Sequence, residues 1–128
     1  MTISANDSIQ TVMSQTTITC RPDADVESLM SAMTSNHIGC IPIVDSANRP
    51  VGIVTKLDLI ECRNAGPKTA RDVMMPCAMT LMTTDTVSRA AKLMSAESFH
   101  HVLVVDTQRT LVGVVSTFDI TRWLASAS

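Results

Sequence analysis

Aromatic side chains are nearly absent from this sequence of 128 residues, since Phe99, Phe118 and Trp123 make up only 2% of it. Proteins that hold single-stranded nucleic acid stack bases on such side chains. Excess positive charge is absent too, because 10 Lys and Arg are outnumbered by 12 Asp and Glu, for a net charge of -2. Without a basic stripe to neutralise phosphates, we expect no nucleic-acid partner.

Long apolar runs are also missing. No segment approaches the roughly 18 consecutive apolar residues of a membrane span. Met1 to Gln10 carries neither the basic opening nor the apolar stretch of a secretory signal. We therefore expect a cytoplasmic protein with no membrane partner.

Recognisable reactive motifs are absent as well. No nucleophile with a supporting His or Asp motif occurs, so we expect no enzyme activity. The four cysteines, Cys20, Cys40, Cys62 and Cys77, lack Cys-x-x-Cys spacing, which predicts buried thiols outside any disulfide. A redox or metal sensor built on them would need thiols of lowered pKa in an electropositive setting, which the sequence does not supply.

A metal site is not expected elsewhere either. His100 and His101 are neighbours in an apolar run, and adjacent side chains of a strand point to opposite faces. The nine methionines substitute for missing aromatics in a core, with Met30, Met33 and Met94 predicted on the buried faces of helices.

The sequence does contain a tandem repeat of one unit. A shift of 61 residues, without a gap, pairs Val12-Met13 with Val73-Met74, Gly52 with Gly113, and Asp58 with Asp119. Gly66-Pro67 marks a turn between the copies. We predict a first repeat at residues 1–65 and a second at residues 66–128.

Each copy follows the same order of predicted elements. Apolar residues at helical spacing start at Val26 and Val87, after the capping residues Asp25 and Thr86. Two β-branched runs follow each helix as a hairpin, at 38–44 with 50–54 and at 99–105 with 111–115. With a first strand before and a helix after, each copy is a β-α-β-β-α unit of the α+β class.

A three-stranded sheet of such short elements leaves an apolar face uncovered when it is alone. The copies should therefore pack together about a pseudo-twofold axis. We expect a ligand in the cleft between the repeats.

Three motifs give the sequence a family resemblance. They are Asp72-Val73-Met74, the strand Ile41-Pro42-Ile43-Val44-Asp45, and Gly-x-x-Thr/Ser-x-x-Asp at Gly52 to Asp58 and at Gly113 to Asp119. The pattern resembles the cystathionine β-synthase (CBS) domain pair, or Bateman module, over roughly residues 9–125. The resemblance implies a stand-alone regulatory module that binds AMP, ADP or ATP, sometimes NAD or S-adenosylmethionine, and forms a homodimer.

The repeated Thr/Ser-x-x-Asp element has a chemical sense. The hydroxyl of Thr55 or Ser116 stands where a strand turns into a helix, beside backbone donors that suit a phosphate. The carboxylate of Asp58 or Asp119 can accept hydrogen bonds from both ribose hydroxyls. The same spacing is also that of a helix capping box, which requires no ligand.

The two copies differ at further candidate positions. Where the family often carries Arg-His, the second copy has His100-His101 and the first has uncharged Gly39-Cys40. The first copy keeps Pro42 where the second has Leu103. In the predicted first strand, Thr17-Ile18 of the first copy corresponds to Ala78-Met79 of the second. Apolar candidates for the base pocket are equally well explained as core. The full set of candidate ligand residues is Thr17, Ile18, Gly39, Ile41, Pro42, Thr55, Asp58, Met79, His100, His101, Val102, Ser116 and Asp119.

Two functions from different classes remain open. The first is a sensor of adenosine-containing nucleotides that signals by a change of shape. The second is a dimerisation or scaffold module whose cleft has degenerated, a reading that Gly39-Cys40 favours for one site. Either would pass its output to an unknown effector protein or to its own oligomer.

Overall fold

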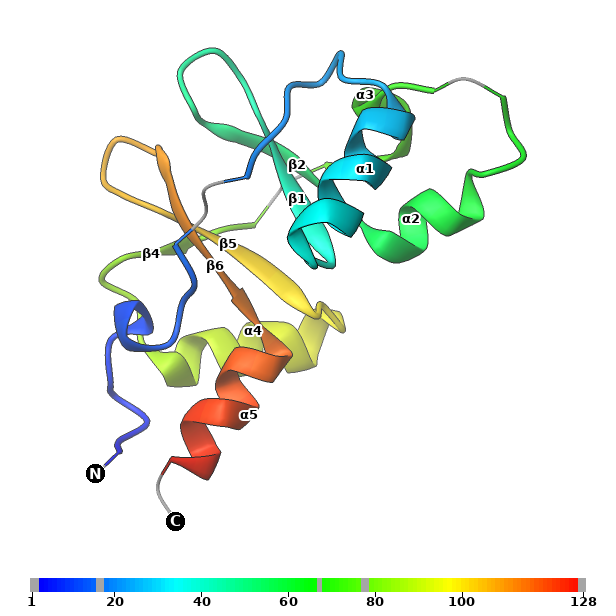
Figure 1. The fold of residues 1–128 in the computed structure, drawn as a ribbon. Coiled ribbons are helices and arrows are strands. Elements are labelled where there is room, and N and C mark those ends of the chain that lie inside the picture. Colours follow the sequence, from blue (N-terminus) through cyan, green and yellow to red (C-terminus); the bar gives the residue numbers. More distant parts are fainter. Residues whose placement is uncertain (1–2, 16–17, 67, 77–78, 127–128) are drawn as a thin grey trace. The chain divides into compact units, whose positions relative to one another are not determined.

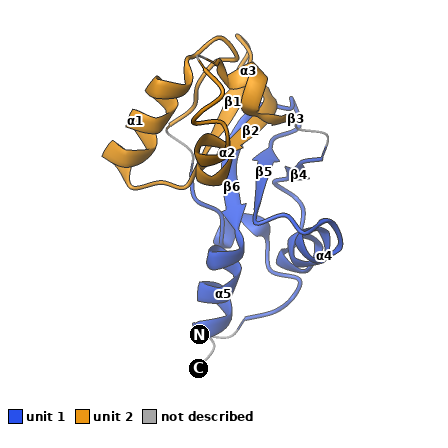
Figure 2. Ribbon diagram, turned by 90° about the vertical axis from the view of Figure 1, so that its right-hand side faces the viewer, with its two compact units in different colours: residues 1–16, 79–128 blue, residues 17–78 orange. Residues whose placement is uncertain are grey.

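The computed structural model describes residues 3–15, 18–66, 68–76 and 79–126, and its elements are labelled in Figure 1. The chain forms two compact units, one of residues 17–78 and one of residues 1–16 together with 79–128 (Figure 2). Each unit has one three-stranded sheet with helices packed on it, which confirms the predicted α+β class. Within the described ranges, no helix is long and apolar enough to cross a membrane.

The unit of residues 17–78 has a sheet in the order β1-β2-β3, with all pairs antiparallel. Helix α1 begins after Asp25, whose carboxylate accepts a hydrogen bond from the Ser28 N–H at 2.7 Å. This confirms the predicted cap. The elements are α1 (Val26–Asn36), β1 (Cys40–Val44), β2 (Pro50–Thr55), α2 (Lys56–Glu61), α3 (Ala70–Val73) and β3 (Met75–Pro76).

The unit that contains the second repeat has a sheet in the order β4-β5-β6, with β4 parallel and β6 antiparallel to β5. Thr86 caps its long helix by accepting from the Arg89 N–H, as predicted. The elements are the 3-10 helix η1 (Ile9–Thr11), β4 (Leu81–Met82), α4 (Val87–Glu97), β5 (His101–Val105), β6 (Leu111–Ser116) and α5 (Thr117–Ala125).

In both hairpins an aspartate side chain accepts hydrogen bonds from the backbone of the turn. Asp45 Oδ1 accepts from the N–H groups of Ala47 and Arg49, and Asp106 Oδ1 accepts from those of Gln108 and Thr110. These bonds satisfy turn donors that the strands leave unpaired. The predicted hairpins are thereby confirmed.

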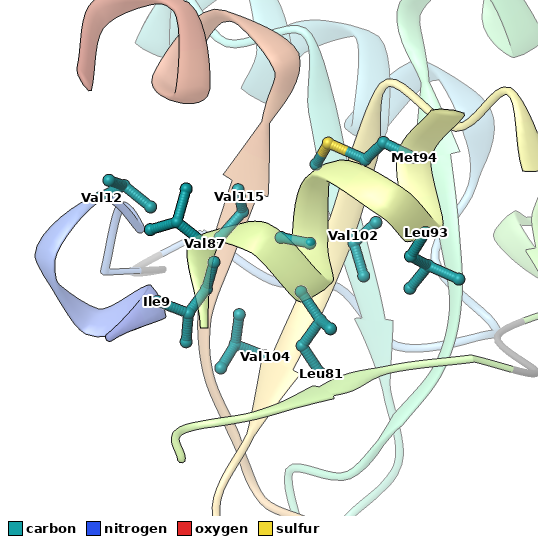
Figure 3. Packing of buried hydrophobic residues seen from close by; sticks show 10 residues of the cluster. Ile9, Val12, Leu81, Val87, Leu93, Met94, Val102, Val104 and Val115 are labelled. Atoms are coloured by element: carbon teal, nitrogen blue, oxygen red, sulfur yellow. The ribbon is translucent and has the colours of Figure 1, made fainter. Parts of the chain in front are cut away.

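Each unit has its own aliphatic core. In the unit of residues 17–78 the buried set is Leu29, Met33, Ile41, Ile43, Val54, Leu59 and Ala70. In the other unit, side chains from η1, α4 and the sheet converge (Figure 3), and the buried set is Ile9, Val12, Leu81, Val87, Ala90, Leu93, Met94, Val102, Val104 and Val115.

The N-terminal segment completes the unit of the second repeat. Ile9 is fully buried there, and Ser14 exchanges backbone hydrogen bonds of 2.9 Å with Val114. In the unit of residues 17–78, β3 pairs with β2 at the corresponding positions, with Met75 opposite Ile53. The compact units thus divide the chain differently from the predicted repeats at 1–65 and 66–128, which remain a prediction about the sequence.

Two local predictions fail, and a third falls partly outside the described residues. Among the described residues, the predicted first strand of the first copy appears as a bridge between Cys20 and Ile43, and Thr17 lies outside them. Met30 is 40% exposed rather than buried, because the face of α1 that packs on the core carries Leu29 and Met33. Cys20, Cys40 and Cys62 are outside any disulfide but only half-buried, and Cys77 is not among the described residues.

Candidate functional site

The second copy of the motif lies where β6 passes into α5. Strand pairing sets His101 opposite Ser116, and the Thr117 N–H donates to the His100 carbonyl at 3.0 Å. The Ser116 Oγ accepts from the Asp119 N–H at 3.0 Å. The structure therefore gathers four of the predicted residues, His100, His101, Ser116 and Asp119, at one strand-to-helix junction.

Asp119 is the one buried charged residue among those the structure describes, with 7% of its surface exposed. Its Oδ2 accepts from the Ser116 N–H at 2.8 Å. Its Oδ1 accepts from Nη2 of Arg122 at 2.9 Å, in an ion pair between residues one helical turn apart. Both carboxylate oxygens therefore already have hydrogen-bond partners.

Arg122 and Phe118 are site residues that the sequence reasoning missed. The Arg122 side chain is 64% exposed, and its guanidinium lies 5.3 Å from the centroid of the Phe118 ring. Phe118 is itself 67% exposed. The available signal was the spacing, because Arg122 stands three residues after the motif Asp119, a helical distance at which side chains meet.

The two histidines of the junction differ in environment. His100 is exposed, whereas His101 is half-buried. Burial lowers the pKa of His101 below its ordinary value, the nearby His100 lowers it further, and the Asp119 charge opposes both. His101 therefore resists protonation in the folded protein, although a carboxylate is close by.

The first copy has the same backbone frame at the junction of β2 and α2. The Lys56 N–H donates to the Gly39 carbonyl at 2.9 Å, and Cys40 lies opposite Thr55. Asp58 Oδ2 accepts from the Thr55 N–H at 2.8 Å and from Thr55 Oγ1 at 2.9 Å. Gly39, Thr55 and Asp58 are thus brought together.

The charge around this first junction differs from that of the second. Glu61 stands where the second copy has Arg122, and Leu57 where it has Phe118. No cationic side chain corresponds to the histidines, because Gly39 and Cys40 occupy those positions. The Lys56 side chain, next to the motif threonine, is exposed. The two junctions share geometry but not electrostatics.

The apolar candidates are distributed between core and surface. Ile41 and Val102 are 0% and 3% exposed and belong to the two cores, and Pro42 is buried beside Ile41. Ile18 is half-buried against the core of its unit, and Met79 is 42% exposed. Ile41 and Val102 serve as core, the alternative that their sequence left open.

Capping is the chemistry that both motifs visibly perform. Thr55 with Asp58 and Ser116 with Asp119 each form a complete capping box, and Thr69 with Asp72 forms a third that the sequence analysis did not anticipate. Phosphate and ribose groups would compete for these same donors and acceptors.

Metal and thiolate chemistry find little support at these positions. Among the described residues, no group of three or more His, Cys, Asp or Glu could hold a metal ion. Burial raises the pKa of the Cys20 thiol, which is the opposite of what a reactive thiolate requires.

Sequence comparison identifies relatives that are longer than this chain. It is 28% identical over 114 residues to the L-aspartate semialdehyde sulfurtransferase of Methanocaldococcus jannaschii. The matched region covers 89% of this chain but only 22% of that enzyme. It is 29% identical over 118 residues to the uncharacterized protein MK0525 of Methanopyrus kandleri, covering 88% of this chain and 60% of the relative. The match to the enzyme therefore involves a fifth of its length.

Solved structures share the fold over nearly the whole chain. The CBS domain pair of protein MJ0100, in complex with 5′-methylthioadenosine and S-adenosyl-L-methionine, superposes with a TM-score of 0.87 at 25% identity, covering 94% of this chain and 98% of that one. CBSX2 from Arabidopsis thaliana, in complex with AMP, superposes with a TM-score of 0.83 at 18% identity, covering 94% of this chain and 97% of that one.

The family model of the CBS domain matches the chain twice, at residues 2–64 and 70–126. These two matches account for almost every residue and agree with the internal repeat read from the sequence. The chain belongs to the CBS domain family, as a tandem CBS domain pair.

Proposed function

We propose that this chain is a regulatory module that binds an adenosine-containing ligand of the AMP, ADP and ATP class. One observation carries the proposal. This tandem CBS domain pair has the Thr/Ser-x-x-Asp junction at the same position of both repeats, and the carboxylate of Asp119 in the second repeat is buried. The complexes of related CBS pairs with AMP, 5′-methylthioadenosine and S-adenosyl-L-methionine support the same ligand chemistry. NAD and S-adenosylmethionine remain further candidates.

In this proposal the carboxylates recognise the sugar. Asp119 and Asp58 accept from the ribose hydroxyls, while Ser116 and Thr55 offer their hydroxyls to a phosphate. His100 and His101 add donors in the second copy. The remaining proposed contacts to the base come from Thr17, Ile18, Gly39 and Met79. At Ile41, Pro42 and Val102, whose side chains are buried, the proposed contact is through the backbone.

We rank the second junction above the first. It has two imidazoles and a guanidinium beside its carboxylate, whereas the first has Gly39, Cys40 and Glu61 at the corresponding positions. An anionic nucleotide gains more from the cationic surroundings.

The ligand would act by favouring one of two conformations for which it has different affinities. We propose that the output passes to a homodimer of this chain or to another protein. A cytoplasmic location, where such nucleotides are available, is part of the proposal.

A scaffold or dimerisation module without a working ligand site is the second candidate. Its support is that the capping boxes of Thr55 and Ser116 are complete without any ligand. The uncharged Gly39-Cys40 pair adds to it for the first copy.

A thermal-unfolding series with AMP, ADP, ATP, NAD, S-adenosylmethionine and 5′-methylthioadenosine distinguishes the two candidates. A ligand at a hundredfold its Kd stabilises the folded state by about 2.7 kcal/mol, a shift of several degrees for a domain of this size. A selective rise in Tm supports the sensor. An unchanged Tm with all six supports the scaffold.

A further inference from the structure

We propose that Arg122 sets the ligand preference of the second junction, favouring adenosine compounds with an anionic 5′ substituent over neutral ones. This inference rests on the function proposed above. It assigns a specificity role to a side chain that the repeated motif does not include.

A ribose and Arg122 compete for Asp119. Both oxygens of this buried carboxylate are occupied, Oδ2 by the Ser116 N–H at 2.8 Å and Oδ1 by Arg122 at 2.9 Å. The Ser116 donor belongs to the backbone of the helix start and is fixed there. Arg122 is 64% exposed on a long side chain, so a ribose that takes Oδ1 displaces the guanidinium.

The displaced guanidinium stays close to the junction, beside Phe118. The ring of Phe118 lies 5.3 Å beneath it, and a cation over an aromatic face is held by electrostatic attraction. Phe118 is therefore a positioning residue that keeps the charge near the junction. A guanidinium left without its carboxylate gains most from a new anion, and it binds phosphate through two parallel hydrogen bonds.

Arg122 is the permanent cation of this junction. Its guanidinium stays protonated at every accessible pH. His101 resists protonation because it is half-buried and lies near His100. Arg122 is therefore the side chain of this junction whose positive charge is available to a 5′ anion at every pH.

The first junction provides the contrast. Its Glu61 and Leu57 replace Arg122 and Phe118, so no guanidinium or aromatic ring stands beside Asp58, and its cation is the exposed Lys56 at the helix start. A preference for an anionic 5′ group that depends on a guanidinium paired with the motif carboxylate is thus specific to the second repeat.

Calorimetric titration with AMP and with adenosine, at pH 7.5 and low salt, tests this assignment. We expect Arg122→Gln to weaken AMP binding relative to adenosine by roughly fivefold, the loss of one exposed charge pair. Arg122→Lys keeps the charge but loses the paired hydrogen bonds of the guanidinium, so it should keep only part of the preference. Phe118→Leu should lose part of it.

Arg109→Gln is the matched control, because it removes the same charge from the β5–β6 turn, at the opposite end of the hairpin from Ser116. It should leave the ratio of the two affinities unchanged. Equal weakening of AMP and adenosine by Arg122→Gln, with Tm lowered, would assign Arg122 to helix capping alone and overturn the inference. Binding of neither compound by the unmodified chain would instead refute the proposed function.

Discussion

His101 shows how a single side chain can link the candidate site to pH. Its pKa is lowered in the folded protein, mainly by burial, from an ordinary value of 6.5. Below that pH the unfolded chain binds a proton more readily than the folded one, so stability is fully present above pH 6.5 and falls on acidification. Burial thus makes the second junction sensitive to mild acid.

The corresponding prediction concerns the slope of stability with pH. Urea unfolding between pH 7.5 and pH 5.5 should show a falling midpoint, and His101→Gln should flatten that fall. The slope m should stay constant if the two states keep their compactness. An identical pH dependence in His101→Gln would contradict the role of this imidazole.

Ser98 is a residue whose backbone conformation is unfavourable for its side chain. It ends α4 in the left-handed region, with φ at 57°, where a glycine has no steric penalty. Ser98→Gly should therefore raise the free energy of unfolding by about 1 kcal/mol. Ser95→Gly, within the exposed face of the same helix, should lower it by about 0.5 kcal/mol. A loss of stability in both variants would contradict this account.

At the scale of elements, a motif glycine marks the point where a distant segment crosses β2 in one unit and β6 in the other. A Cβ on Gly113 would lie 2.8 Å from Met13 Sδ and 2.9 Å from the Ser14 carbonyl oxygen, and Gly52 has the same relation to Met74 and Met75. The close approach that the motif glycine permits is therefore to the protein's own chain.

Gly113→Ala should consequently destabilise the protein by about 1–3 kcal/mol, the usual cost of forcing atoms into a packed site. The matched control is Gly39→Ala, since a Cβ at Gly39 meets nothing within 4 Å. Chemical denaturation of both variants measures the difference. Equal denaturation midpoints would show that the segment around Met13 shifts to accommodate the added methyl group without a loss of stability.

Sequence patterns predicted the elements whose signals are local. The helix caps at Asp25 and Thr86 and the two hairpins follow from side chains within a few residues of each other. The first strands have weaker local signals, because among the described residues each is held by only one or two pairings, at Cys20 and at Leu81–Met82. Such short strands depend on tertiary contacts that no local pattern encodes.

The candidate site was predictable to the same extent. The junction residues Ser116 and Asp119 meet because the motif spacing brings them together on one helix turn. The roles of Arg122 and Phe118 were missed because the family motif ends at Asp119. Ile41 and Val102 could not be assigned from sequence, since a base pocket and a core both require apolar residues.

At the scale of the whole molecule, the repeat in the sequence and the compact units of the structure do not coincide. Residues 1–16 belong with 79–128, where Ile9 and Val12 join the core and Asp7 accepts from the Trp123 indole N–H at 3.2 Å. Removing Ile9 and Val12 would leave cavities that cost several kcal/mol each.

We therefore predict that a fragment of residues 79–128 is unfolded by itself and folds when a peptide of residues 1–16 is added. Dispersion of amide signals in the NMR spectrum reports folding directly. The same peptide with Ile9→Asp is the control and should not induce folding. A well-dispersed spectrum of the fragment alone would show that the N-terminal segment is dispensable.

The central claim is that the Thr/Ser-x-x-Asp junctions bind an adenosine-containing ligand rather than only cap helices. Calorimetric titration of AMP and S-adenosylmethionine into Asp58→Ala, Asp119→Ala and the unmodified chain tests it most directly. We predict saturable binding that Asp119→Ala weakens by about 10- to 100-fold, and Asp58→Ala by less, because hydrogen bonds to a charged group are lost. Unchanged affinity in both variants, with stability lowered, would contradict the claim and leave helix capping as the role of both motifs.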